Sequence, residues 1–127
     1  MAKRIGAQPS GAKRGDVADT PDLGHLVWLW FTPQAGREQA GRRPALVLTP
    51  RTYNSKTGLC VVCPVTNQVK GYAFEVALPD GFPVQGVILA DHIKSADWPE
   101  RQCEYICQAP PEVLDDVHAK IKALFGM

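Results

Sequence analysis

Apolar residues occur in short runs separated by turn-forming residues, a pattern typical of β structure rather than of a helical bundle. Each run is rich in branched, aromatic or cysteine side chains, and Gly, Pro and Asn are frequent between the runs. The candidate strands are residues 25–31, 43–48, 59–66, 74–78, 86–90 and 104–107. The third run is apolar almost throughout, which predicts burial on both faces. Short strands at this even spacing favour a closed, barrel-like sheet.

The C-terminal segment has a helical period instead. Apolar residues from Val113 to Leu124 recur at intervals of three and four, which predicts an amphipathic helix. Pro111 suits a first helical position, and Gly126 is placed to end the helix. Acidic residues near the start and lysines near the end agree with the helix dipole. We expect this helix to pack on the barrel or on a partner.

The segments between these elements differ in character. A chain of 127 residues has room for one domain. Residues 1–21 contain almost no large apolar side chain, so we predict a flexible tail followed by a single domain at 22–127. Pro33–Gly41 is rich in Gly and Pro and predicts a long, mobile loop of the kind that often carries function. Pro50–Gly58 is predicted to turn the chain back.

The charge is nearly balanced overall but uneven along the chain. The net charge is +1, which argues against a broadly basic nucleic-acid binder. Residues 33–74, however, carry six Lys and Arg against one acid, whereas residues 75–127 carry four against nine. If the middle third forms one surface, that surface could hold a polyanion. Solvated loop cations would give the same counts, so both interpretations stay open.

The four cysteines could indicate disulfides, a metal site or simple packing. Residues 1–20 lack an apolar signal core, and no apolar run reaches membrane length, so we predict a soluble, cytoplasmic protein with free thiols and no membrane association. Cys60 and Cys63 lie three apart on a predicted strand and therefore point to opposite faces. Cys103 and Cys107 have no histidine beside them. We therefore predict core cysteines, with no metal and no other cofactor.

Three residues could act together on a phosphate group. Glu38 and Arg43 flank the end of the long loop, and Thr66 ends the third strand. A 2′-hydroxyl of RNA can attack its own phosphorus without a metal, given a base, an acid and charge stabilisation. This set could supply those groups. A carboxylate that caps a turn and an arginine that bridges strands are an equally good interpretation.

Other polar and aromatic residues could contact such a substrate. Asn67, Gln68 and Lys70 follow Thr66 in a polar turn and offer amides and a cation. His92 follows Asp91 and could bind substrate or titrate near neutral pH, although a histidine satisfied within the fold is the simpler interpretation. Trp28 and Trp30 share one strand face and could stack on bases, fill the core or contact another subunit.

Several segments, in order along the chain, resemble one known family, the MazF/PemK ribonuclease toxins. The matching segments are residues 24–28 (GHLVW), 38–48 (EQAGRRPALVL), 53–58 (YNxKTG, where x does not match), 64–66 (PVT), 70–76 (KGYxFEV) and 89–95 (LADHIKS). The resemblance implies an SH3-like antiparallel barrel with a C-terminal α-helix that pairs into a homodimer. It also implies an endoribonuclease of a toxin–antitoxin pair, which cleaves single-stranded RNA at short sequences without a metal and is silenced by a cognate MazE-like antitoxin.

The resemblance also assigns roles to single residues. It implies that Glu38 acts as base or proton shuttle, that Arg43 stabilises the phosphate and that Thr66 positions it, with a 2′,3′-cyclic phosphate and a 5′-hydroxyl as the product ends. The residues expected to contact RNA are Arg37, Gln39, Asn67, Gln68, Lys70, Asp91 and His92. His25 stands where the family usually has Asp, and His92 replaces a usual Gln. Two alternatives stay open on the same fold: a non-enzymatic toxin resembling gyrase inhibitors, and a plain RNA-binding barrel.

Overall fold

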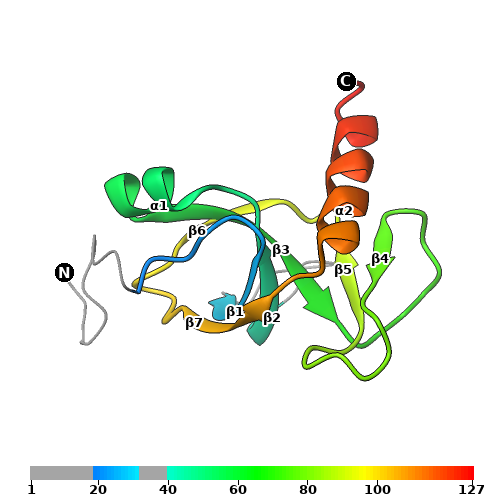
Figure 1. The fold of residues 1–127 in the computed structure, drawn as a ribbon, viewed down its shortest axis with the longest axis horizontal. Helices are drawn as coiled ribbons and strands as arrows, with labels where there is room; N and C mark the ends of the chain where they lie inside the picture. The colour runs from blue at the N-terminus through cyan, green and yellow to red at the C-terminus, as the bar shows by residue number, and fades with distance from the viewer. Residues whose placement is uncertain (1–18, 32–39) are drawn as a thin grey trace.

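The computed structural model describes residues 19–31 and 40–127, which form seven strands and two helices (Figure 1). In chain order these are β1 (His25–Phe31), β2 (Gly41–Val47), α1 (Arg51–Thr57), β3 (Leu59–Thr66), β4 (Glu75–Ala77), β5 (Val87–Leu89), β6 (Lys94–Asp97), β7 (Glu104–Gln108) and α2 (Pro111–Leu124). The mainly β fold with a C-terminal helix is confirmed, and each of the six strands expected from the sequence is present. Neither α1 nor α2 is long and apolar enough to span a membrane.

All strand pairs of the described chain are antiparallel, and they form one sheet in the order β4-β5-β3-β2-β1-β7. β3 is the central strand because it pairs with β2 along one edge and with β6 and then β5 along the other. The described residues show no pairing that joins β4 to β7. Closure of the sheet into an SH3-like barrel therefore stays a prediction.

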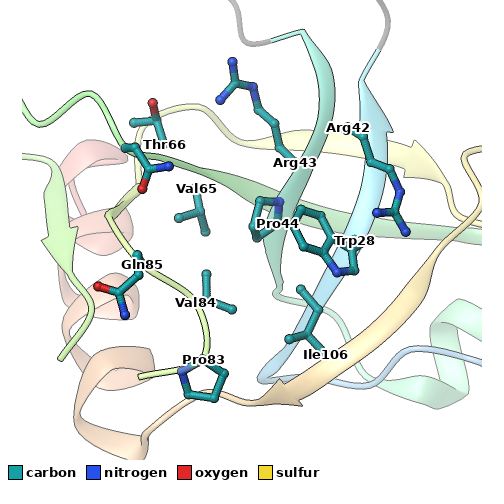
Figure 2. A pocket seen from close by; sticks show the side chains of 11 residues that line it. Trp28, Arg42, Arg43, Pro44, Val65, Thr66, Pro83, Val84, Gln85 and Ile106 are labelled. Carbon is teal, nitrogen blue, oxygen red and sulfur yellow. The ribbon is translucent and has the colours of Figure 1, made fainter. Parts of the chain in front are cut away.

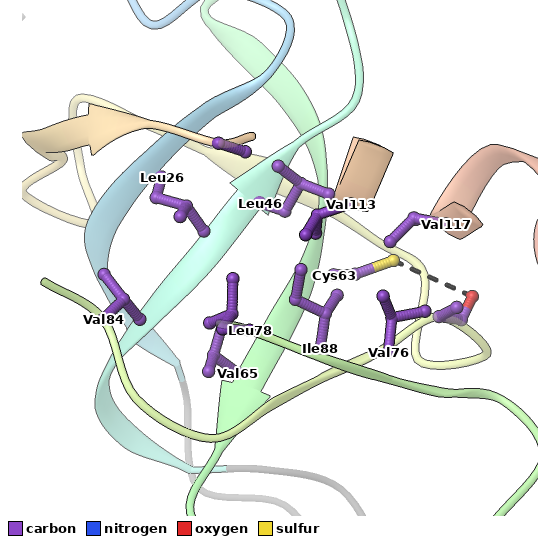
Figure 3. Close-up of a cluster of buried hydrophobic side chains, with 12 residues drawn as sticks. Leu26, Leu46, Cys63, Val65, Val76, Leu78, Val84, Ile88, Val113 and Val117 are labelled. Carbon is purple, nitrogen blue, oxygen red and sulfur yellow. Dashed lines mark hydrogen bonds between the residues drawn. The ribbon is translucent and has the colours of Figure 1, made fainter. Parts of the chain in front are cut away.

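One hydrophobic cluster lies between the sheet and α2 (Figure 3). Leu26, Leu46 and Ile88 come from three strands and are fully buried, and Val113 and Val117 of α2 pack against the same cluster. This confirms the apolar stripe predicted for the helix. Packing of α2 on the sheet also fixes β3, whose last residue, Thr66, belongs to the candidate site.

A second cluster gathers around the indole of Trp98. Trp98 is buried against Cys60 and strand residues of β1, β2 and β3, and its indole N–H donates to the backbone oxygen of Asn54 at 2.9 Å. Cys60 and Cys63 are buried free thiols, as predicted, and burial raises the pKa of both to about 12. These thiols are therefore packing residues.

Two elements differ from the sequence-based expectation. Pro50–Gly58, predicted as a turn, contains the helix α1, which ends at Gly58 in the left-handed conformation (φ 72°). Its buried Asn54 donates to the backbone oxygens of Pro21 (2.8 Å) and Thr49 (2.9 Å). The prediction also missed β6, which pairs with the first half of β3. Both segments lack an apolar pattern of their own and are stabilised by contacts with the rest of the fold.

The start of the described chain is packed against α1. Residues 1–18 lie outside the described residues, but Thr20 is only 2% exposed and Pro21 is buried. Arg51 donates from Nε to the backbone oxygen of Thr20 at 3.2 Å and approaches the Asp22 carboxylate at 3.7 Å. The packed region thus includes two residues that the sequence assigns to the tail, and the division between tail and domain stays a prediction.

Candidate active site

A cavity of about 320 Å³ opens beside the ends of β2 and β3 (Figure 2). Arg43 of β2 and Thr66 of β3 lie at the same end of it, and apolar side chains such as Val65 and Ile106 line the remainder. The strand register explains this meeting. Ala45 pairs with Pro64, and continuing that antiparallel register by two residues places Arg43 opposite Thr66. The structure therefore brings together two of the three predicted catalytic residues.

Arg43 is oriented by the chain that leads into β2. Its Nε–H donates to the backbone oxygen of Ala40 at 2.8 Å. The two terminal nitrogens of a guanidinium held in this way can bind two oxygens of one phosphate. Glu38, the predicted base, lies outside the described residues, as do Arg37 and Gln39. Their predicted roles stay predictions.

Thr66 is held more tightly, because it is 5% exposed and its backbone is crowded by Gly86. Its Oγ1 accepts the N–H of Gln68 at 3.1 Å, so the hydroxyl proton is available to a substrate oxygen. A Cβ at Gly86 would lie 2.9 Å from the Thr66 carbonyl carbon and closer still to its oxygen. Gly86 has φ of +107°, which favours glycine on its own account. Thr66 is thus positioned by a contact that only glycine permits.

A stacked pair forms one wall of the same cavity. The guanidinium of Arg42 lies 4.8 Å from the centre of the Trp28 ring, and Arg42 also forms an ion pair with Glu104 of β7. Trp28 was a candidate for base stacking from the sequence, whereas Arg42 was not singled out as a site residue. A signal was present, because an arginine on a strand beside an aromatic strand is a common stacking partner. Asn67 lines this cavity as well, as expected for a substrate contact.

A second, smaller cavity of about 90 Å³ adjoins the first at Thr66, which lines both. Four of the predicted RNA-contacting residues meet there: Gln68, Lys70, Asp91 and His92. The structure adds Tyr72, Glu75 and Leu89. Tyr72 was not singled out as a site residue, although its place in the polar segment after Thr66 could have suggested it.

The segment that carries Lys70 and Tyr72 is fixed by one carboxylate. Glu75 accepts the backbone N–H groups of Lys70 (3.0 Å) and Gly71 (2.9 Å). On the opposite side, His92 Nε2 lies 4.0 Å from the Asp91 carboxylate. Gln68, Lys70, Tyr72, Asp91 and His92 of the smaller cavity therefore lie in segments between strands, beside the strand residues Thr66, Glu75 and Leu89.

His25, which the resemblance marks as a departure, lines neither cavity. Its Nδ1 accepts the N–H of Asp22 at 3.1 Å, and its ring lies edge-on to Tyr105. Burial lowers the pKa of His25, which keeps the ring neutral as this hydrogen bond requires. Within residues 19–31 and 40–127, no three His, Cys, Asp or Glu side chains are grouped as metal ligands.

Comparison with known proteins agrees with this geometry. Residues 22–125 match the family described as PemK-like, MazF-like toxin of type II toxin–antitoxin system. The endoribonuclease toxin MazF of Escherichia coli K12 is 49% identical over 106 residues, covering 84% of this chain and 95% of that protein. The E. coli endoribonuclease PemK is 30% identical over 98% of this chain and 90% of its own length.

Solved structures give the same answer. The crystal structure of MazF from Deinococcus radiodurans is 58% identical, superposes with a TM-score of 0.81, and covers 85% of this chain and 98% of its own. A MazE-MazF complex from the same organism is 56% identical, with a TM-score of 0.77 and the same coverage. The chain therefore belongs to the family of PemK-like, MazF-like toxins of type II toxin–antitoxin systems and is a homologue of the endoribonuclease toxin MazF.

Proposed function

We propose that this toxin cleaves single-stranded RNA at short sequences by a metal-independent attack of a ribose 2′-hydroxyl on the adjacent phosphorus. A bond forms between O2′ and phosphorus, and the bond from phosphorus to O5′ breaks. The products are a 2′,3′-cyclic phosphate and a 5′-hydroxyl. The observation that carries the proposal is that Arg43 and Thr66 lie at the same end of one cavity.

Each group has a separate task in this reaction. The Arg43 guanidinium binds the non-bridging oxygens, where negative charge grows as the fifth bond to phosphorus forms. The Thr66 hydroxyl accepts the N–H of Gln68 and still carries its own proton, which it donates to one of these oxygens. Glu38 takes the proton from O2′ and, as the proton shuttle, passes it to O5′ when the bond from phosphorus to O5′ breaks. The last two steps rest on the family resemblance.

The walls of the larger cavity suit a nucleotide on one side of that phosphate. The Arg42 guanidinium lies over the ring of Trp28. The cavity wall therefore offers an aromatic side chain for a base and a cation for the phosphate backbone. Val65, Val84 and Ile106 provide an apolar lining. We propose this cavity as the site of one nucleotide that flanks the scissile bond.

The proposed assembly is a homodimer of SH3-like barrels that binds a MazE-like antitoxin. Support for the antitoxin comes from the solved MazE-MazF complexes of D. radiodurans. Exposed apolar residues at the C-terminus, including Phe125 (63% exposed) and Met127 (85%), and on β1 and β7 are available for protein contacts. Sedimentation of the toxin alone and with its antitoxin tests both parts.

Cleavage of a long RNA in excess EDTA tests the chemistry. We expect cutting to continue, with cyclic phosphate and 5′-hydroxyl ends mapped at a short motif. A 2′-O-methyl group on the nucleotide 5′ to each cut should abolish cutting there, because O2′ then has no proton to lose. Loss of activity on chelation, or equal cleavage of DNA and methylated RNA, contradicts the mechanism.

The two alternatives give different results in related assays. A plain RNA-binding barrel predicts salt-dependent binding without any cut product. A toxin that acts by binding alone predicts that Glu38→Ala stays toxic in cells while removal of Phe125–Met127 ends toxicity. We expect the reverse for Glu38→Ala, namely a non-toxic protein that still binds RNA.

A further inference from the structure

The wall of the larger cavity carries an ion pair that the proposed cleavage reaction does not use. Arg42 of β2 lines the cavity, and its guanidinium is paired with the carboxylate of Glu104 on β7. Among the described residues that line this cavity, Arg42 and Arg43 are cations and none is an acid. Glu104, which lies outside the lining, therefore neutralises one of the two cations that the cavity offers to a polyanion.

The strand register places this ion pair across the face of Trp28. Trp28 of β1 pairs with Glu104 of β7, and Arg42 pairs with Trp30, two residues farther along β1 and on the same face. The Arg42 guanidinium lies over the Trp28 ring, 4.8 Å from its centre, and there it meets Glu104. Stacking on an indole orients a guanidinium without help from a carboxylate. Arg42 therefore does not need Glu104 to keep its position.

The ion pair is open to solvent, mainly at the carboxylate. The Glu104 side chain is 67% exposed, and that of Arg42 is 34% exposed. Exposed ion pairs contribute little to stability and are weakened by salt. A guanidinium binds a phosphate with the same N–H donors that it uses for a carboxylate. Arg42 can therefore leave Glu104 for a phosphate at small cost.

Arg42 is placed to bind a phosphate other than the scissile one. Figure 2 shows Arg42 on the side of Trp28 that faces away from Thr66, whereas Arg43 and Thr66 lie at one end of the cavity. A strand whose scissile phosphate is at Thr66 would bring another backbone phosphate toward Arg42. Because like charges repel, Glu104 opposes the approach of that phosphate as long as it remains beside Arg42.

We propose that Glu104 competes with the RNA backbone for Arg42: it pairs with Arg42 in the free protein, and a phosphate displaces it when RNA binds. This inference rests on the proposed function and adds a residue that sets RNA affinity. Glu104 acts through Arg42 and touches no reacting atom, so it is a positioning residue. Because every RNA carries backbone phosphates, the competition weakens the binding of all sequences and leaves discrimination to base contacts.

Glu104→Gln tests the exchange, because the amide keeps the size of the side chain and a hydrogen-bond acceptor but removes the charge. The probe is an uncleavable 2′-O-methyl RNA, titrated by fluorescence anisotropy. We expect Kd to fall on the order of three- to tenfold at about 0.05 M salt, and this gain to shrink at about 0.3 M, where exposed ion pairs are screened. With unmodified RNA, KM should fall by a similar factor while kcat stays the same.

Arg42→Gln separates the exchange from a general effect of charge. In this background Glu104→Gln should lose most of its gain in affinity, because no guanidinium is left to release. Glu100→Gln removes the same charge from an exposed turn outside both cavities and should leave Kd near the wild-type value. Thermal unfolding of Glu104→Gln should also stay close to the wild type, since the ion pair is exposed.

Three results overturn the inference. Weaker RNA binding by Glu104→Gln would mean that the carboxylate orients Arg42, an unchanged Kd would mean that no competition occurs, and an equal gain with and without Arg42 would mean that Glu104 acts by charge alone. Failure of the wild type to cut any RNA in EDTA would instead contradict the proposed function. The binding titration needs no cleavage, so the two failures are distinguishable.

Discussion

The two cavities that meet at Thr66 are built in different ways. The larger one has its reactive groups on paired strands, where the β2–β3 register places Arg43 opposite Thr66. The smaller one takes most of its polar side chains from the segments that follow β3 and β5, and the first of these segments is held by the strand residue Glu75. Strand pairing positions a group precisely and tolerates little change, whereas turns accept varied side chains. We therefore expect the larger cavity to govern the chemical step and the smaller one to govern which RNA is bound.

Removal of the Arg43 guanidinium should give the largest effect. Losing one oriented transition-state donor costs about 2.7 to 4 kcal/mol, or roughly 100- to 1,000-fold in kcat. Arg43→Ala should therefore reduce single-turnover cleavage by this factor while RNA binding falls much less. Lys56→Ala removes an exposed cation from α1 and should cleave normally. Near wild-type rates for Arg43→Ala would show that the larger cavity does not hold the reacting phosphate.

Gly86→Ala should give the second largest effect, because its methyl group would overlap the Thr66 carbonyl. Thr66 must shift, so we expect kcat to fall on the order of tenfold, with a loss of about 1 to 3 kcal/mol in the free energy of unfolding. Single-turnover kinetics and thermal unfolding measure the two effects separately.

Gly81→Ala is the matched control for that substitution. Gly81 also has a positive φ (+77°), but nothing lies within 4 Å of an added Cβ. Both substitutions therefore place a side chain at a positive φ, but only the one at Gly86 brings a Cβ into contact with Thr66. If both variants lose cleavage equally, positioning of Thr66 by Gly86 is not the cause.

Glu75→Gln should give the smallest effect, and this effect should weaken RNA binding without slowing the chemical step. The amide oxygen can accept, but its NH₂ group would face a backbone donor, which costs about 1 to 2 kcal/mol at the turn. We expect KM to rise several-fold with kcat near the wild-type value. Glu112→Gln, on the exposed start of α2, should change neither. A drop in kcat without a change in KM would mean that the smaller cavity affects the chemical step and not RNA binding.

The part of the fold that could be predicted is the part with a strong local pattern. α2 was predicted because its apolar residues recur with a helical period over 14 residues. α1 was missed because its 7 residues carry no apolar stripe, and its stability comes from Asn54, which is buried against Pro21 and Thr49. β6 was missed for a similar reason, since Lys94–Asp97 is mostly polar and becomes a strand by pairing with β3.

The candidate site also contains residues that the sequence predicted and contacts that it did not. Arg43 and Thr66 were predicted from the segments shared with the family, and both line the larger cavity. The stacking of Arg42 on Trp28 and the position of Tyr72 beside Asp91 were not. The strand composition and the polar turn offered hints of these contacts, but the contacts join residues far apart in the chain, so only the folded structure shows which residues meet.

The sequence by itself determined six of the seven strands, the C-terminal helix, the family and the residue types available for chemistry, because these follow from local periodicity and from short contiguous segments. Only the tertiary structure decided that Thr66 lies between two cavities and that its backbone leaves room for glycine alone at position 86. It also decided that the Glu75 carboxylate accepts the backbone N–H groups of Lys70 and Gly71. Such facts depend on contacts between distant segments, which form only when the chain is folded.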